Sequence, residues 1–147
     1  MSSRHRSRER ALQILYLLDM RQQPVDEAIE AYYGSLAVDE GESRPEPDLF
    51  TGELVSGVAM KTGELDARIE KSAENWRINR MAAVDRSILR LAVYEMLFVG
   101  TPPPIAIDEA LLLAQRFSGD ASVSFINGVL DAVKRGLPDA GDRSQTT

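Results

Sequence analysis

The segment from Ala83 to Val99 constrains the fold of this chain more than any other part of the sequence. In its first half, apolar residues recur at helical spacing and polar residues occupy the opposite side. In its second half, residues 91–99, only Glu95 is charged, and this apolar stretch is too short to cross a membrane. We therefore predict a central helix near 83–99 that begins at the surface, enters the interior and ends at Gly100, before the prolines at 102–104.

The rest of the chain also shows helical periodicity, and no alternating strand pattern of any length occurs in it. The sequence therefore predicts an all-α fold, a single-domain bundle of about seven helices over residues 1–135, with a disordered tail at 136–147. An exposed loop is expected at 38–46, and Trp76 is expected to fill the core between two helices. Besides the central helix, the expected helices cover residues 7–22, 25–37, 47–62, 64–75, 107–117 and 123–135.

The residue types that most catalytic sites need are missing from the sequence. The absence of Cys excludes disulfides, thiolate nucleophiles and zinc held by Cys. The chain has a single His, so no pair of His residues can bind a metal. This His lies in the basic segment and forms no Ser–His couple there. No Gly-rich phosphate-binding motif occurs either. We therefore expect no enzymatic activity, no cofactor and no metal. Because no segment resembles a signal peptide or a membrane span, we also expect a cytoplasmic protein without a membrane partner.

Two features break the local pattern of the predicted helices. Glu95 lies in an apolar run, where an ionised carboxylate costs several kcal/mol unless it is paired. A structural Glu95, bonded to free backbone N–H groups of the next helix start, is favoured over a catalytic one. Gly128, after Asn127 in the last helix, costs about 1 kcal/mol relative to Ala. Close approach of another helix explains Asn127 and Gly128 best, with the Asn127 amide hydrogen-bonded to the backbone of that helix. Close approach of a ligand is the alternative.

Charge is distributed unevenly along the chain, which has a formal net charge of −6. Residues 1–10 and residues 76–90 each carry four Arg and one acidic residue, whereas residues 26–53 hold nine carboxylates and one Arg. This segregation indicates a basic face on an acidic body, or two different partners; a solvated acidic surface with a loose basic tail is the alternative. The Arg residues of the first segment alternate, so they would share a side in an extended chain and spread around a helix.

The first predicted helix carries more apolar surface than one buried face requires. Ala11, Ile14 and Leu15 belong to its main stripe, and Leu12 and Tyr16 form a second stripe beside it.

Three segments together resemble the NusB family of transcription antitermination factors. ALQILYLLDM after the Arg-rich start resembles the first helix of that family, and VDRSILRLAVYEM resembles its central helix. PPPIAIDEALLLAQRFSGDASVSFINGVLD resembles its C-terminal signature. The resemblance covers residues 4–133 and implies an all-helical protein without catalysis. It further implies binding to the boxA element of ribosomal RNA operon leader transcripts together with NusE, a small-subunit ribosomal protein, within an antitermination complex that helps RNA polymerase read through terminators.

The resemblance also assigns site residues by matching positions. Phe125, off the buried stripe of the last helix, would offer a stacking face for an unpaired base. The partner surface for NusE would contain Leu12, Tyr16 and Asp85. Asp108 stands where the family has Asn, and Gln115 where it often has Lys. The positive electrostatic potential that would attract RNA is therefore weaker in this part of the chain. Besides Phe125, the residues expected to contact RNA are Arg4, His5, Arg6, Arg8, Arg10 and Arg116.

Two other functions are compatible with parts of this pattern. NusB-like domains also occur fused to ribosomal RNA cytosine methyltransferases, but this chain has no Gly-rich cofactor-binding half and no Cys nucleophile. The chain could also form a homodimer that masks its RNA face, and the sequence leaves this possibility open.

Overall fold

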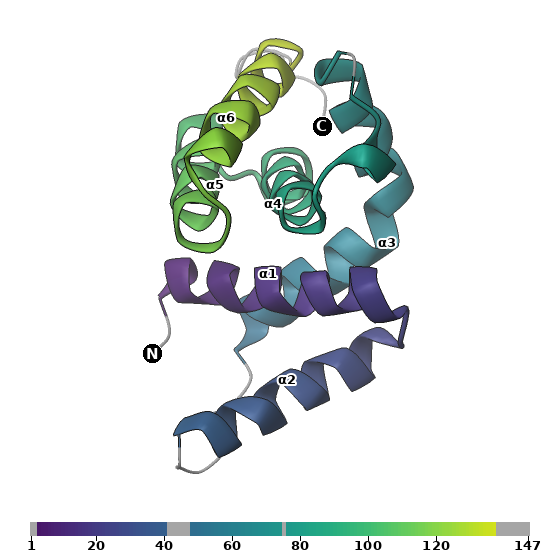
Figure 1. The fold of residues 1–147 in the computed structure, drawn as a ribbon, viewed down its shortest axis with the longest axis vertical. Helices are drawn as coiled ribbons and strands as arrows, with labels where there is room; N and C mark the ends of the chain where they lie inside the picture. The colour runs from purple at the N-terminus through teal and green to yellow at the C-terminus, as the bar shows by residue number, and fades with distance from the viewer. Residues whose placement is uncertain (1–2, 41–47, 75, 138–147) are drawn as a thin grey trace.

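The computed structural model describes residues 3–40, 48–74 and 76–137, without the side chains of 36–40, and contains no strand among them (Figure 1). The predicted all-α bundle of about seven helices is confirmed, with six α-helices in the described residues. A 3-10 turn, η1 (Ile78–Arg80), precedes the central helix, and a π-helical turn, η2 (Glu95–Val99), continues it. The α-helices are α1 (Arg4–Arg21), α2 (Val25–Glu40), α3 (Leu49–Ser72), α4 (Ala83–Tyr94), α5 (Pro103–Phe117) and α6 (Asp120–Arg135).

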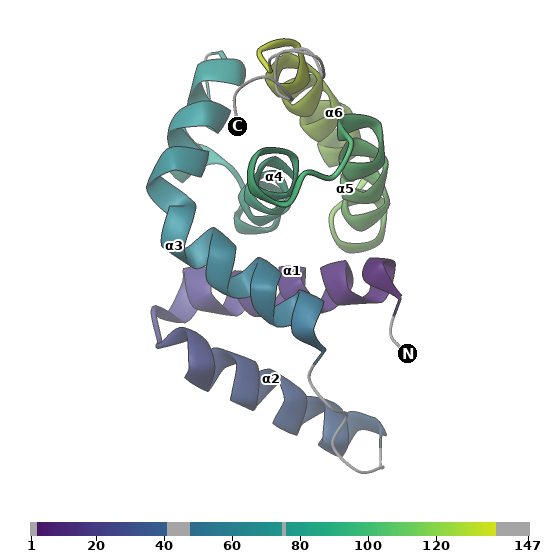
Figure 2. The ribbon, with the colours of Figure 1, turned by 180° about the vertical axis from the view of Figure 1, so that it is seen from behind.

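The predicted central helix is confirmed as α4 together with η2. It lies in the middle of the bundle, with α3 on one side, α5 and α6 on the other, and α1 across one end of this group (Figures 1 and 2). Gly100 ends it with φ of 86°, a left-handed conformation that favours Gly. The expectation that its second half is buried all round is wrong, because Phe98 is 42% exposed. The Phe98 ring packs on Tyr94, with the two ring centres 5.5 Å apart, and lies under the Lys61 ammonium of α3.

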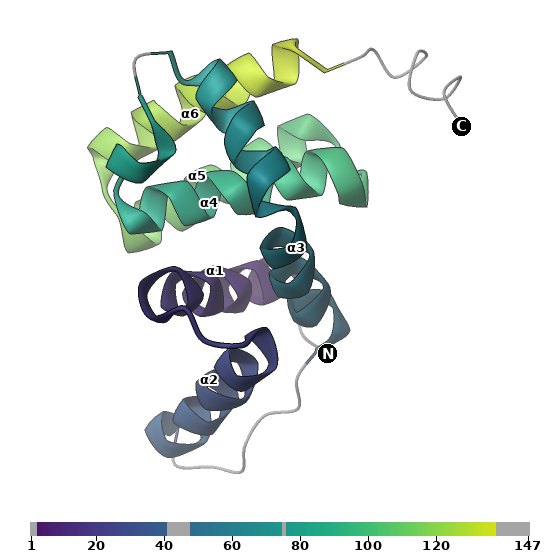
Figure 3. The ribbon, with the colours of Figure 1, turned by 90° about the vertical axis from the view of Figure 1, so that its right-hand side faces the viewer.

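Helix α3 is one long helix, whereas two helices were predicted at 47–62 and 64–75. Its buried residues lie on both sides of the predicted break, Leu54 to Val58 before it and Leu65 to Ile69 after it, and the Thr62 hydroxyl donates to the Val58 carbonyl oxygen within the helix. At 24 residues it is roughly 36 Å long, enough to contact both α2 and α6. Helix α2 packs on α1 and α3, on the side of α1 away from α4 (Figure 3).

Several element boundaries differ from the predicted ones. Helix α2 continues through Glu40, and the rest of the expected loop, 41–46, lies outside the described residues, as does 138–147 of the expected tail. Helix α5 begins at Pro103, because Pro suits a first helical turn as well as it stops the preceding helix. Helix α6 begins at Asp120, with Gly119 before it, three residues earlier than the predicted start at 123.

Trp76 is not the core residue that the sequence predicted. Its side chain is 51% exposed, because α3 ends at Ser72 and Trp76 lies beyond that helix, before Arg77, which is also exposed. The predicted helix contact at Gly128 is also wrong, since a Cβ added there would meet no atom within 4 Å. Asn127 and Gly128 both lie on the exposed side of α6. None of the helices within the described ranges is both long and apolar enough to cross a membrane.

Asp48 joins the start of α3 to α1. Its carboxylate accepts the Thr51 backbone N–H at 2.7 Å and the hydroxyls of Thr51 and Ser7 at 2.8 and 2.9 Å. Burial by itself raises the pKa of Asp48, but these hydrogen bonds and the charge of Arg10 outweigh it and hold the pKa below its usual value. Asp48 is therefore a helix cap that is stronger when ionised.

We expect Asp48→Ala to lower the free energy of unfolding by about 1 kcal/mol at neutral pH, through loss of the cap. Asp48→Asn keeps a capping oxygen but loses the charge, and serves as the control. Because the pKa is lower in the folded chain, the ionic contribution is complete above the unfolded Asp value of about 3.9 and disappears as the pH falls through the folded value. Thermal melts should show the gap between wild type and Asp48→Asn closing below pH 4; a constant gap would contradict this role.

Candidate RNA interface

The Arg-rich segment is the first turns of α1 and not an extended tail. The Ser3 hydroxyl oxygen accepts the Arg6 backbone N–H at 3.1 Å and caps the helix. Successive Arg side chains therefore point to different sides of α1, whereas Arg4 and Arg8, one turn apart, both approach the Phe50 ring. The alternative of a loose basic tail does not describe this segment.

Arg8 points into the core and not toward solvent. Its Nε and Nη2 donate to the two carboxylate oxygens of Glu95, both at 2.7 Å, and the Thr101 hydroxyl donates to the same carboxylate at 2.9 Å. The side chains of Arg8 and Glu95 are only 5% and 2% exposed. Burial by itself lowers the pKa of Arg8, but the hydrogen bond and charge of Glu95, with the charge of Glu109, hold it above its usual value.

This pair confirms that Glu95 is buried and changes the expected partner. The carboxylate is satisfied by a guanidinium from α1 and not by backbone N–H groups of the next helix start. The expectation that Arg8 contacts a phosphate conflicts with its burial. Arg10 is also only 8% exposed; its Nη1 lies 3.4 Å from Asp48, and its guanidinium carbon 5.6 Å from the Tyr33 ring centre.

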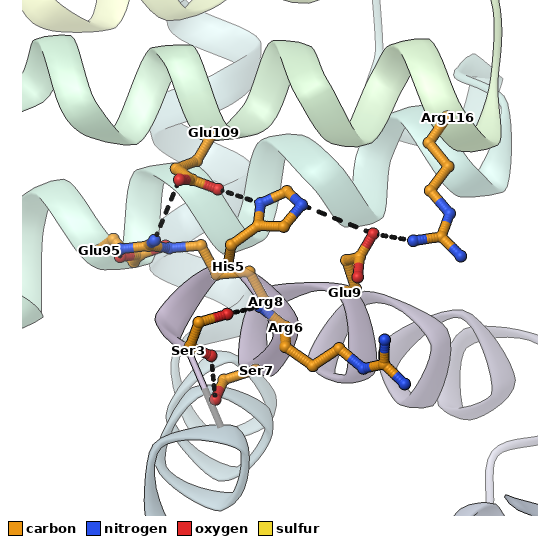
Figure 4. A network of polar contacts seen from close by, with 9 residues as sticks. All are labelled: Ser3, His5, Arg6, Ser7, Arg8, Glu9, Glu95, Glu109 and Arg116. Atoms are coloured by element: carbon orange, nitrogen blue, oxygen red, sulfur yellow. Dashed lines mark hydrogen bonds and ion pairs between the residues drawn. The ribbon is translucent and has the colours of Figure 1, made fainter. Parts of the chain in front are cut away.

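A chain of polar contacts joins the start of α1 to α5 (Figure 4). His5 Nδ1 lies 2.7 Å from Glu109, which is also 3.6 Å from Arg8 Nη1. The second ring nitrogen of His5 lies 3.6 Å from Glu9, and Glu9 in turn forms an ion pair with Arg116. Glu9 is nearly buried, whereas the Arg116 side chain is 60% exposed. Arg116 is therefore held against α1 with most of its side chain open to solvent.

Arg4 and Arg6 complete the exposed basic group at this end of the molecule. The guanidinium carbon of Arg4 lies 4.2 Å from the centre of the Phe50 ring, a cation–π contact that leaves the side chain exposed. Arg6 points away from the polar network and has no ion pair within the described ranges (Figure 4). We name Arg4, His5, Arg6 and Arg116 the basic end.

The second basic segment, 76–90, is divided between the interior and the surface. Arg86 donates to Asp19 at 2.7 Å, and Arg90 forms a two-pronged pair with Asp66 at 2.7 and 2.9 Å. These two arginines tie α4 to α1 and α3, so they do not belong to a free basic face. Arg77 and Arg80, before α4, are exposed.

Phe125 belongs to a second location. It lies on α6 and faces the segment that connects α3 to α4. It is half-buried, and its ring centre is 5.8 Å from that of Trp76 in an edge-to-face arrangement. A groove of about 280 Å³ lies on the α4 side of these two rings, and one of about 470 Å³ lies on the α3 side. Sequence reasoning identified Phe125 through its family position and missed Trp76, because an aromatic residue at a helix end is typical of a core.

The second apolar stripe of α1 lines a groove of about 350 Å³. Leu12 is buried at 2% exposure and forms part of its floor, whereas Tyr16 is 37% exposed. Asp85 does not line this groove: it is 8% exposed and accepts the hydroxyls of Ser118 and Ser122, both at 2.9 Å. Its side chain thus fastens the turn between α5 and α6. The groove is lined by Leu12, Gln13, Tyr16, Leu17, Tyr32, Val84 and Phe117.

Comparisons with known proteins agree on one family. The model of the NusB family matches residues 5–135. The transcription antitermination protein NusB of Solibacter usitatus is 57% identical over 139 residues, covering 95% of this chain and 93% of that protein.

Solved structures agree with this assignment. The NusB structure of T. maritima covers 97% of this chain and 98% of its own, with 26% identity and a TM-score of 0.79. A crystal structure of the antitermination factors NusB and NusE in complex with double-stranded RNA contains a chain that matches with 25% identity and a TM-score of 0.76, covering 92% of this chain and 100% of its own. The fold, the extent of the match and its identity together show that this chain belongs to the NusB family of transcription antitermination proteins.

Proposed function

We propose that this protein binds the boxA RNA of ribosomal RNA operon leader transcripts together with NusE, and so promotes read-through by RNA polymerase. The observation that carries the RNA part is the basic end, where Arg4, Arg6 and Arg116 are exposed on α1 and α5. Guanidinium groups match phosphate oxygens in geometry and charge. A related chain has been solved with NusE and double-stranded RNA, which supports the same assembly for this protein.

The buried arginines have a different role in this proposal. Arg8 and Arg10 hold α1 against Glu95 and Asp48, so they fix the position of the exposed side chains without contacting RNA themselves. The groove with Leu12 and Tyr16 is the proposed NusE surface. It is apolar, partly open and on a different part of α1 from the basic end, so both partners can bind at once.

Salt-dependent binding tests the RNA part. We expect Arg6→Ala to weaken binding of a boxA RNA and to lower the slope of log K against log salt by about 0.7, the value for one lost phosphate contact on a single strand. The measurement is fluorescence anisotropy with labelled RNA, with and without NusE, at four salt concentrations. Point substitutions are required because deleting the first ten residues would also remove Arg8 from the core.

Lys61→Ala is the matched control for this experiment. Lys61 is a basic residue on α3, near Glu64, and lies outside the basic end. Its substitution should leave both affinity and slope unchanged. If Arg6→Ala and Arg4→Ala behave like Lys61→Ala, the basic end does not hold the transcript and the proposal is wrong.

A further inference from the structure

Trp76 is the only Trp of the chain, and half of its side chain is exposed to solvent. Because the neighbouring Phe125 ring is itself only half-buried, the two rings form one apolar patch, and an apolar patch with polar residues around it is typical of an interaction site. The Trp76 ring meets Phe125 in an edge-to-face arrangement at an interplanar angle of 68°, so Phe125 supports Trp76, and a groove lies on either side of the two rings. The two rings come from different parts of the fold, α6 and the segment before η1.

The space around the two rings is open on both sides. On the α4 side, the groove includes Arg80 and Ser122; on the α3 side, it includes Ser124, Gly128 and Arg135. Gly128 is not explained by helix packing, because a Cβ there would meet no atom within 4 Å. Because Gly128 has no side chain, a flat ligand can approach the backbone of α6 closely at this position.

The charged groups around the pair favour an anionic ligand. Arg77 and Arg80 are exposed and have no ion pair within the described residues. Each groove is also lined by one carboxylate. In the α4-side groove it is Asp85, which accepts hydrogen bonds from two serine hydroxyls; in the α3-side groove it is Glu74. Arg135 is paired with Asp131. Flat aromatic faces beside free guanidinium groups match the base and the phosphate of a nucleotide.

We propose that Trp76 and Phe125 together form a stacking site for one unpaired base of the bound RNA, with Arg77 and Arg80 beside its phosphates. This inference rests on the proposed RNA-binding function and names a residue and a contact beyond it. Stacking is tolerant of base identity, so the pair would fix the register of the strand more than its sequence.

The single Trp makes the test direct, because all Trp fluorescence of the chain comes from Trp76. Titration with a single-stranded boxA RNA should quench this fluorescence. RNAs with one abasic position each should quench equally well, except at the position that stacks on Trp76. Trp76→Ala should weaken RNA binding by about 5- to 150-fold, the range for loss of one stacked base, and Trp76→Phe should recover most of it.

Phe98→Ala is the matched control, since Phe98 is a comparably exposed aromatic residue far along the chain from this site. It should not change RNA affinity. The salt slope should be the same in Trp76→Ala as in wild type, because no phosphate contact is removed. Thermal melts establish that each variant is folded; if Trp76→Ala is not, the abasic scan on the wild-type protein decides.

The outcomes separate this inference from the proposed function. If RNA binds and Arg6→Ala lowers the slope, but fluorescence and the Trp76 variants are unaffected, the stacking site is wrong and the proposed function stands. Quenching by NusE alone, with no further change on adding RNA, would mean that the pair docks a protein and would also overturn the inference. If no boxA RNA binds under any condition, the proposed function fails and the stacking site fails with it.

Discussion

Glu95→Gln is expected to lower the free energy of unfolding by about 3–5 kcal/mol, the usual cost of removing one partner from a buried ion pair. The substitution preserves the shape of the side chain, but it leaves the Arg8 guanidinium buried without the charge that balances it. Glu109 is the other carboxylate near Arg8, and at 3.6 Å it is too far to replace two short hydrogen bonds.

Chemical denaturation followed by circular dichroism measures this loss. The control is the double variant Arg8→Met with Glu95→Leu, which removes both charges and fills the space with apolar atoms. It should recover most of the stability, because a well-packed apolar pair often equals a buried ion pair. A loss below about 1 kcal/mol for Glu95→Gln, the range of exposed ion pairs, would show that water reaches this site and that Arg8 is free to turn outward.

Tyr16→Ala is expected to weaken binding of NusE by about 2 kcal/mol or more, roughly 30-fold, while the fold stays intact. Tyr is among the residues that contribute most at protein interfaces, because its large ring loses little conformational freedom on binding. Tyr16 is 37% exposed at a groove whose floor includes Leu12. Its removal therefore changes the surface of α1 and leaves the core packing in place.

Isothermal titration with purified NusE measures the effect, and Leu112→Ala is the control. Leu112 is a half-exposed apolar residue on α5 that does not line the groove. Both variants should melt near the wild-type temperature. Unchanged NusE affinity in Tyr16→Ala would rule out the proposed surface. If Tyr16→Ala instead converts a dimer to a monomer in sedimentation analysis, the groove joins two copies of this chain.

Much of the fold was predictable because helical periodicity reports burial locally. The central helix, its end at Gly100 and the burial of Glu95 all follow from residues close together in the sequence. The merging of two predicted helices into α3 was not predictable in this way. Gly63 weakens a helix by itself, and packing of the buried residues on either side of it, up to Val58 and from Leu65, favours one continuous helix.

The candidate site was predictable in its residue types and less so in its geometry. Arg4, Arg6 and Arg8 look equivalent in the sequence, yet Arg4 and Arg6 are exposed and Arg8 is in the core. Trp76 shows the opposite error, since its apolar character suggested the interior. In each case the deciding factor was what packs against that position: Arg4 and Arg8 lie one turn apart on the same side of α1, but only Arg8 meets Glu95.

The sequence by itself determined which segments are helical, which side of each helix is apolar, and, through matched motifs, the family. Those properties depend on neighbours within a turn or two of the same chain segment. Only the tertiary structure decided that Glu95 takes its partner from α1, that Asp85 fastens the α5–α6 turn, and that Trp76 meets Phe125. Each of these contacts joins residues from different elements, so it depends on how whole helices pack, which no local pattern records.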